Sequence, residues 1–302
     1  MSKTSTITIA CALCVGAARE LYLAPALAAI STCIDTLVVN DNSGPSHGEN
    51  RATLTGSAFG RDGRLRIYGH AFVDFADMRN RAYAHLAELD PRPDWVLFLD
   101  ADEVHGEQLR YIAREILPRL GPNIGRVDAY TYHFWGTFGW ITDIARRFVF
   151  FRYAPDVRWE NAVHERAVGV RGRSLVLPYI YHHYGNVVPP AALATKWGRY
   201  YDLGNDVPPP PTPDVVTRDV YLARATDVRP YRAPHPTVAR ETLAAIATAF
   251  APEFALLDAG FVARRTRAMR VTASLRGLNE TLRVGLRRVE HPGLYRERTP
   301  AR

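Results

Sequence analysis

The chain is poor in lysine, in cysteine and in long apolar runs, although it has 302 residues. Lys3 and Lys196 are the two lysines among 38 basic residues, and all the others are arginine. This arginine excess suits phosphate binding, but a GC-rich genome also produces it, so it does not select a function. Cys11, Cys14 and Cys33 include a single C-x-x-C pair. We therefore expect buried thiols rather than a zinc or redox site.

No apolar run reaches the length of a membrane-spanning helix, and the first residues lack a basic region followed by a hydrophobic core and a cleavage site. We therefore expect a cytoplasmic protein with reduced thiols. A hydrophobic content of 47% is enough for a sizeable core, and the length suits one domain with an appendage. Four consecutive prolines at 208–211 indicate a stiff connector, so we divide the chain into residues 1–205 and 206–302.

The most informative stretch is Trp95 to Glu103, with the sequence WVLFLDADE. Its apolar residues are too few for a helix and run directly into three acids, which is the pattern of a buried strand that ends in carboxylates. On an extended chain Asp100 and Asp102 point to the same side, where they repel unless a cation lies between them. Such oxygen ligands suit Mg²⁺ or Mn²⁺, especially when a substrate diphosphate completes the coordination. Capping of the next helix would explain one of these acids, not three.

The first 205 residues alternate between predicted strands and helices. We predict strands at 6–15, 34–39, 64–68, 95–99 and 175–181, a β-rich stretch at 126–153, helices at 17–31, 75–89, 107–120 and 186–205, and an irregular polar loop at 46–63. This order predicts an α/β fold in which helices cover both faces of a mostly parallel sheet. Ligands of such sheets bind at the carboxyl ends of the strands, so Asp41, Asp100 and Asp102 should converge on one crevice.

Two segments leave alternatives open. Residues 130–140 are dense in aromatic side chains, which either pack in the core or form an acceptor platform, because aromatic faces pack on sugar rings. In the C-terminal region, helical patterns cover 237–250 and 259–288, and eleven arginines stand against three acids from Ala259 onward. These arginines either form a surface that contacts a membrane or an acidic partner, or they lie on a solvated helix face. We favour the solvated face, because no Trp or Phe cluster follows Phe261.

These residues resemble the family 2 glycosyltransferases of the GT-A type, which are Rossmann-like enzymes that transfer a sugar from a nucleotide donor with inversion at the anomeric carbon. The resemblance covers roughly residues 6 to 200 and depends on five pieces in the family's order. They are Val38-Val39-Asn40-Asp41-Asn42-Ser43, Arg79-Asn80, Leu99-Asp100-Ala101-Asp102 as the DxD motif, Val163-His164-Glu165, and His183-Tyr184-Gly185. The chain departs from the pattern at Asn40, where many relatives carry the first acid of a pair.

The resemblance also implies roles for individual residues. It implies that Asp41 contacts the base or the ribose, that Arg79 lies near the nucleotide, and that Asp100 faces the ribose or the metal. It implies that Asp102 ligates a divalent cation, Mn²⁺ or Mg²⁺, which bridges the donor diphosphate. His183 is either a further metal ligand, a residue that orients the diphosphate, or a histidine packed at a strand end.

The acceptor hydroxyl needs a carboxylate that takes its proton. We predict Glu165 for this role, with Asp143 as the alternative; an ion pair between Glu165 and Arg166 or another nearby arginine explains the residue equally well. Glu103 suits the role less, because a carboxylate beside a cation is a poorer proton acceptor. Of the adjacent His182 and His183, only one can face the cleft, since neighbours on a strand point in opposite directions.

The sequence thus predicts a metal-dependent inverting glycosyltransferase with a nucleotide-sugar donor and an unidentified acceptor, whether a glycan, a lipid-linked molecule or a small molecule. A non-catalytic nucleotide-sugar-binding protein would keep the same cleft. A metal-dependent nucleotidyltransferase would also keep it, but residues 16–19 (GAAR) are a poor substitute for a glycine-rich phosphate loop. No nucleic-acid partner is expected, because no recognised binding motif accompanies the net charge of +7. Peripheral contact of the Arg-rich C-terminus with the inner membrane face stays open.

Overall fold

The computed structural model describes residues 7–16, 18–43, 48–205, 212–265, 278 and 282. In the first half of the sheet, β1 (Ile9–Val15) lies between β2 (Thr36–Asp41) and β4 (Trp95–Asp100), and β3 (Leu65–Gly69) follows β2; all of these pairs are parallel. Side chains of β1 alternate between two cores. Cys11 and Leu13 pack with α1 (Leu23–Ile30), whereas Ala12 and Cys14 pack with α4 (Phe75–Ala84). Helices therefore cover both faces, as predicted.

The second half of the sheet contains the long strands. Here β7 (Thr137–Arg152) pairs antiparallel with β4 and with β6 (Ile124–Trp135), and β10 (Arg173–His183) lies parallel to β6. The short strands β5 (Glu103–Val104) and β11 (Arg229–Pro230) pair with β10 and β7. Within the described residues nine strands thus form one sheet, in the order β3-β2-β1-β4-β7-β6-β10-β5 with β11 beside β7. The predicted α/β class is confirmed.

For the aromatic stretch, the burial of the side chains decides between core packing and an acceptor platform. Phe134, Trp135 and Trp140, in the aromatic stretch, are buried in the core. Core packing, and not an acceptor platform, therefore explains these three side chains. All three cysteines are buried and free, as expected.

The prediction of an irregular loop at 46–63 is wrong. Helices α2 (Gly48–Thr55) and α3 (Ala58–Arg61) occupy most of this segment. Leu54 and Phe59 are fully buried, and the Ser57 hydroxyl accepts a hydrogen bond from the Gly60 backbone amide as an N-cap. Two apolar anchors in a polar segment are too few to give a helical periodicity, and tertiary packing stabilises these helices.

The other helices follow the predicted order with shifted ends. The first begins at Leu23 rather than near residue 17, and residues 108–119 form α5 (Gln108–Tyr111), a π-helical turn (Ile112–Ile116) and a 3-10 turn (Leu117–Arg119). Helix α6 (Pro190–Asp202) confirms the helix predicted at 186–205. A small two-stranded sheet, β8 (Arg158–Glu160) and β9 (Arg166–Val168), stands beside α4.

The described part of the C-terminal region is helical and packs on the β6–β7 hairpin. It contains α7 (Pro213–Val215), the turns Val216–Tyr221 and Leu222–Thr226, α8 (Arg240–Ala249) and α9 (Ala251–Arg264). Asp258 on α9 accepts hydrogen bonds from Thr137 Oγ1 and Trp140 Nε1, at 2.8 and 2.9 Å. The start of the helix predicted at 259–288 belongs to α9, which ends at Arg264, and most of the Arg-rich segment after it lies outside the described residues. In the part that the structure describes, no single helix is long and apolar enough to cross a membrane; residues 237–249 and 251–264, bent by 89°, meet that test only as a pair.

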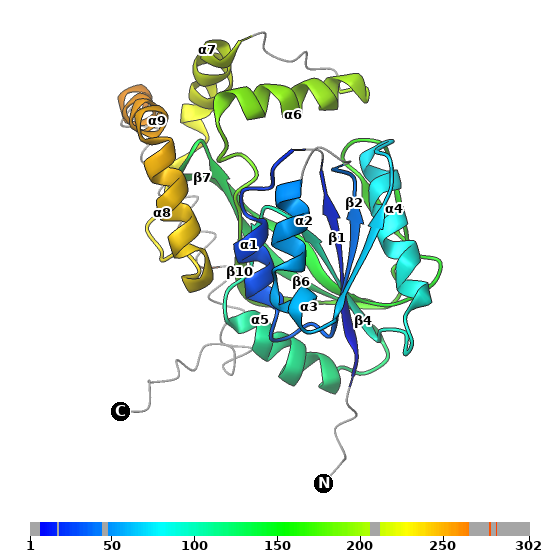
Figure 1. Cartoon of the computed structure of the whole chain (residues 1–302). Helices are drawn as coiled ribbons and strands as arrows, with labels where there is room; N and C mark the ends of the chain where they lie inside the picture. Colours follow the sequence, from blue (N-terminus) through cyan, green and yellow to red (C-terminus); the bar gives the residue numbers. More distant parts are fainter. Residues whose placement is uncertain are drawn as a thin grey trace.

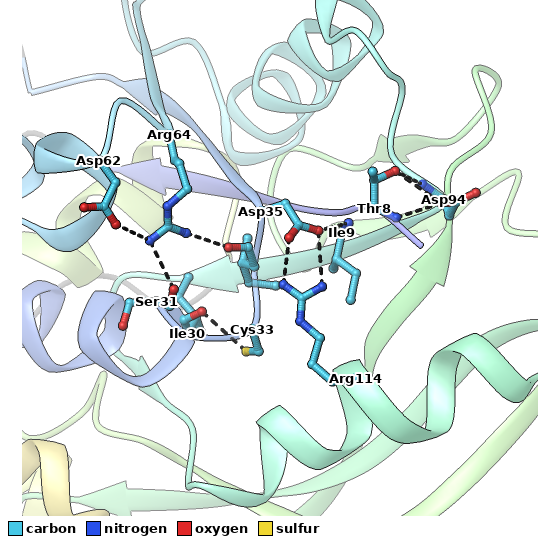
Figure 2. Close-up of polar contacts among 11 residues, drawn as sticks. Thr8, Ile9, Ile30, Ser31, Cys33, Asp35, Asp62, Arg64, Asp94 and Arg114 are labelled. Atoms are coloured by element: carbon cyan, nitrogen blue, oxygen red, sulfur yellow. Dashed lines mark hydrogen bonds and ion pairs between the residues drawn. The ribbon is translucent and has the colours of Figure 1, made fainter. Parts of the chain in front are cut away.

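The two edges of the sheet differ in what they present. At the amino ends of the strands, Asp35 accepts hydrogen bonds from the Ile9 amide and from Arg114, both at 2.7 Å, and Asp94 accepts one from the Thr8 amide (Figure 2). A cavity of about 240 Å³ lies at this edge and is lined in part by Thr8 and Asp35. Helix α6 crosses the opposite edge, where β1 and β2 end (Figure 1). The predicted site residues lie at that opposite edge.

Candidate active site at the carboxyl ends of the strands

Three predicted site residues stand at or beside strand ends. Asp41 ends β2, Asp100 ends β4 and His183 ends β10. Cys14 of β1 pairs with Asn40 on one side and with Asp100 on the other. Because neighbouring strands lie about 4.8 Å apart, the β2 and β4 ends are roughly 10 Å apart, which is within the span of one nucleotide.

Asp102 and Asp100 have different partners. Strand β4 ends at Asp100 and the chain turns at Ala101 and Asp102, so the two carboxylates do not line one extended face as the spacing predicted. The backbone carbonyl of Asp102 accepts a hydrogen bond from the Tyr184 amide, at 2.9 Å. Through this bond Asp102 stands against the end of β10, where its Oδ1 lies 3.3 Å from His183 Nε2.

The spacing of Asp102 and His183 is compatible with two adjacent ligands of one divalent cation. Two ligands at right angles on Mg²⁺ stand about 3 Å apart, close to the 3.3 Å between Oδ1 and Nε2, which is long for a charge-assisted hydrogen bond. Oδ1 is buried and has no hydrogen-bond partner among the described residues. A Cβ at Gly185 would collide with Asp102 Oδ2 and stand 2.9 Å from His183 Nε2. Glycine at this position thus lets Asp102 and His183 approach the backbone closely.

The described residues contain no group of three or more His, Cys, Asp or Glu side chains placed to hold a metal alone. Two protein ligands completed by substrate phosphates and water are a usual coordination for Mg²⁺. The arrangement of Asp102 and His183 therefore suits a cation that arrives with an anionic substrate.

Gly185→Ala tests the close approach of Asp102 and His183 to this glycine. Gly185 does not have a left-handed backbone conformation, so alanine is tolerated by the backbone, and the nearest atoms to its Cβ belong to Asp102 and His183. We expect Mn²⁺-dependent nucleotide affinity to fall at least about tenfold, because the carboxylate must move, while the thermal midpoint changes little. Isothermal titration with nucleoside diphosphate, with and without Mn²⁺, measures this loss. Gly48→Ala, at the start of α2, where nothing lies within 4 Å of an added Cβ and the backbone is not left-handed, controls for the substitution. Unchanged Mn²⁺ dependence in Gly185→Ala would place the cation elsewhere.

Arg79 joins Asp100 and Glu165 in a partly buried ion-pair triad. Its Nη1 and Nη2 atoms lie 2.8 and 3.0 Å from the two Asp100 oxygens, and its Nε lies 2.6 Å from Glu165 Oε1. The guanidinium also stacks on Phe98, at 4.8 Å. Burial alone would lower the pKa of Arg79, but the two carboxylates outweigh it and the pKa is raised. The ion pair that the sequence offered as an explanation of Glu165 is present, with Arg79 as the partner.

The β8–β9 turn and α4 together place Glu165. Asn161 and His164 in this turn have φ angles of 75° and 56°, the left-handed region that non-glycine residues rarely adopt. Asn80 of α4 donates to the Trp159 carbonyl at 2.9 Å and accepts from the Trp159 amide at 2.7 Å. The Arg79-Asn80 pair therefore holds both the side chain of Glu165 and the backbone leading to it.

The adjacent residues Asn40 and Asp41, at the end of β2, have different hydrogen-bond partners. Asn40 is fully buried, and its amide donates to the Met78 carbonyl of α4 at 2.8 Å. An ionised aspartate cannot donate that bond, which gives a physical reason for the departure at this position. The Asp41 carboxylate accepts hydrogen bonds from the Ser43 amide, at 3.0 Å, and from the Ser43 hydroxyl, and lies 3.5 Å from Arg51. Asp41 is thereby fixed at the end of β2.

The two adjacent histidines point in opposite directions, as predicted. His182 bonds Tyr231 at 2.7 Å in an aromatic cluster, and burial lowers its pKa to about 3. Burial would also lower the pKa of His183, but the Asp102 carboxylate outweighs burial and raises it. Glu103 accepts hydrogen bonds from the Asp100 amide and Tyr181, both at 3.2 Å, and burial raises its pKa to about 7. The side chain of Asp143, in β7, lies outside the described part.

The sequence reasoning missed Glu20 and Lys196. Glu20 accepts a hydrogen bond from the Gly16 amide at 3.0 Å, and burial followed by the charge of Asp102 raises its pKa to about 7. Lys196 on α6 lies 3.9 Å from Asp102 Oδ2. For Asp102, burial raises the pKa, but the charges of His183 and Lys196 outweigh burial, so the net pKa is lowered. The scarcity of lysine was the one sequence signal that pointed to Lys196.

No family model matches the chain, and no curated protein matches its sequence. A solved structure of glucosyl-3-phosphoglycerate synthase from Mycobacterium tuberculosis, in complex with Mn²⁺, uridine diphosphate and glucosyl-3-phosphoglycerate, matches 41% of this chain at 19% identity and a TM-score of 0.30. The match spans 44% of the synthase, less than half of its length. TarS 1–349 from S. aureus matches over 92% of each chain at 11% identity and a TM-score of 0.36. Likeness at this distance transfers no activity, so function is argued below from this chain's own residues.

Proposed function

We propose that the protein is a metal-dependent inverting glycosyltransferase of the GT-A type, which moves a sugar from a nucleotide diphosphate donor to an acceptor hydroxyl. The observation that carries this proposal is the arrangement of Asp102, His183 and Gly185. It presents a carboxylate oxygen and an imidazole nitrogen at ligand spacing beside a glycine that lets both approach the backbone, at the edge of the sheet where such folds bind nucleotides. In this proposal Asp41 contacts the base or the ribose.

The reaction breaks the bond between the anomeric carbon and the diphosphate oxygen while the acceptor oxygen bonds to the opposite face of that carbon. The leaving diphosphate gains negative charge, and the acceptor loses a proton. Mn²⁺ or Mg²⁺, held by Asp102 and His183, would neutralise the departing charge. Asp100 would face the ribose or the metal, and its bidentate pairing with Arg79 fixes the position of its carboxylate.

Glu165 is the proposed proton acceptor, with Asp143 as the alternative. Arg79 Nε lies 2.6 Å from Glu165 Oε1 and holds the carboxylate in a fixed orientation. Glu165→Gln separates the roles: loss of a base lowers turnover roughly a hundredfold with donor affinity kept, whereas transfer at near the wild-type rate moves the role to Asp143.

A panel of labelled nucleotide sugars tests the proposed class. We expect one or a few donors to bind and to be slowly hydrolysed with Mn²⁺ or Mg²⁺, and neither to occur in EDTA. Metal-dependent binding with no hydrolysis, in the presence of a broad set of acceptors, would favour the non-catalytic alternative. Formation of a nucleotide sugar from a nucleoside triphosphate and a sugar 1-phosphate would identify a nucleotidyltransferase. If none of these nucleotides binds, the proposed site is wrong.

A further inference from the structure

Lys196 stands out by composition and by position. It is the one lysine among the described residues, in a chain whose basic residues are otherwise arginine apart from Lys3. It lies on α6, which crosses the carboxyl edge of the sheet (Figure 1). Chain folding thus brings a lysine from a distant segment to the DxD aspartate.

The Lys196 ammonium lies between two groups of the proposed metal site. Its Nζ donates to the Gly185 carbonyl at 3.2 Å and lies 3.9 Å from Asp102 Oδ2. A third of the side chain is exposed, so Lys196 is partly accessible from solvent. An ammonium has three donors, and the Gly185 carbonyl uses one of them, so donors remain for an anionic ligand. The nearby Arg79 is already bonded to two carboxylates.

We propose that Lys196 binds the diphosphate of the nucleotide donor and stabilises the charge it gains as it leaves. This inference extends the proposed function. When the bond between the anomeric carbon and the diphosphate oxygen breaks, its electron pair stays on that oxygen, and a compact ammonium beside it lowers the energy of the transition state. Lys196 would therefore act on the leaving group, and Glu165 or Asp143 on the acceptor proton.

In the same position, Lys196 should weaken the binding of a cation to Asp102 when no nucleotide is present. Before a ligand arrives, Lys196 is a charge partner of Asp102 at 3.9 Å. A divalent cation on Asp102 would then stand close to a second positive charge, and only an anion can offset their repulsion. Metal and nucleoside diphosphate should bind with positive coupling, because each improves the site for the other.

Lys196→Met should change the affinities for nucleoside diphosphate and for Mn²⁺ in opposite directions. We expect the affinity for a nucleoside diphosphate in EDTA to fall by roughly tenfold to a hundredfold, the range for a hydrogen bond to a charged group. We expect the affinity for Mn²⁺ alone to rise severalfold, because Asp102 loses its competing partner. Titration calorimetry measures the first affinity, and electron paramagnetic resonance of free Mn²⁺ measures the second. Lys196→Gln, whose amide can still donate to the Gly185 carbonyl, should behave in the same way.

Arg199→Met is the matched control. Arg199 lies on the same helix, stacks on Phe72 at 5.2 Å, and its removal takes away one positive charge without touching Asp102. We expect less than a threefold change in both affinities. Weaker binding of both Mn²⁺ and nucleotide in the Lys196 variants would mean that the residue only supports the local structure, and would overturn the inference. The inference is also overturned if the wild-type protein binds nucleotide and the Lys196 variants bind it with unchanged affinity. A wild-type protein that binds no nucleoside diphosphate under any condition would overturn the proposed function as well.

Discussion

Asp102→Asn is expected to lower sugar transfer at least about a hundredfold and to abolish the metal-dependent part of donor affinity. The substitution keeps the size of the side chain but removes the negative charge that faces His183 and Lys196, at 3.3 and 3.9 Å. Product formation and donor titrations, each with Mn²⁺ and with EDTA, measure the two effects. Asp156→Asn is the matched control, because Asp156 pairs with Arg171 on the surface of the protein. Transfer that keeps both its rate and its metal dependence in Asp102→Asn would reject the metal assignment.

The same variant has an expected effect on stability. The sequence suggested mutual repulsion between Asp100 and Asp102, but in the structure Asp102 faces cationic partners and its pKa is lowered. A folded-state pKa below the unfolded value stabilises the protein above the unfolded pKa, and this contribution is lost as the pH falls. We therefore expect Asp102→Asn to cost about 1 to 2 kcal/mol of unfolding free energy at neutral pH. The difference from the wild type should shrink in acid, and urea denaturation at several pH values measures it.

Arg79→Met is expected to lower the free energy of unfolding by about 3 kcal/mol, because it leaves Asp100 and Glu165 without their shared cation. The exposed fractions of the three side chains, 15% for Arg79, 16% for Glu165 and 35% for Asp100, keep this loss below that of a fully buried triad. Urea denaturation measures the effect. The double variant with Glu165→Gln should regain part of the stability, since one of the two unpaired charges is then removed.

Arg81→Met is the matched control for Arg79. Arg81 lies two residues further along α4 and pairs with Asp77 at 2.7 Å, but its side chain is 41% exposed. An exposed pair at this spacing contributes less than about 1 kcal/mol. Equal losses in Arg79→Met and Arg81→Met would show that the triad contributes no more than a surface ion pair. That result would favour a direct contact between Arg79 and the nucleotide, near which the resemblance placed this residue.

The alternation of strands and helices, the burial of the cysteines and the strand that ends in Asp100 were determined by the sequence itself. These features depend on periodicity and on local residue chemistry, which neighbouring residues carry in full. The positions of Asp41, Asp100 and His183 at strand ends followed for the same reason. Where the local signal was weak the prediction was wrong, as in α2 and α3, which two buried side chains anchor in a polar segment.

The partners of the site residues were decided by the tertiary structure alone. Arg79 pairs with Glu165 because the β8–β9 turn folds back onto α4, and Lys196 reaches Asp102 because α6 crosses the edge of the sheet. Asp100 and Asp102 face different partners because the strand ends between them. Such contacts join residues far apart in the chain, and they depend on the sheet order and the packing of the helices. Local periodicity contains neither, so the sequence proposed candidate site residues but missed Glu20 and Lys196, and it did not predict which side chains meet.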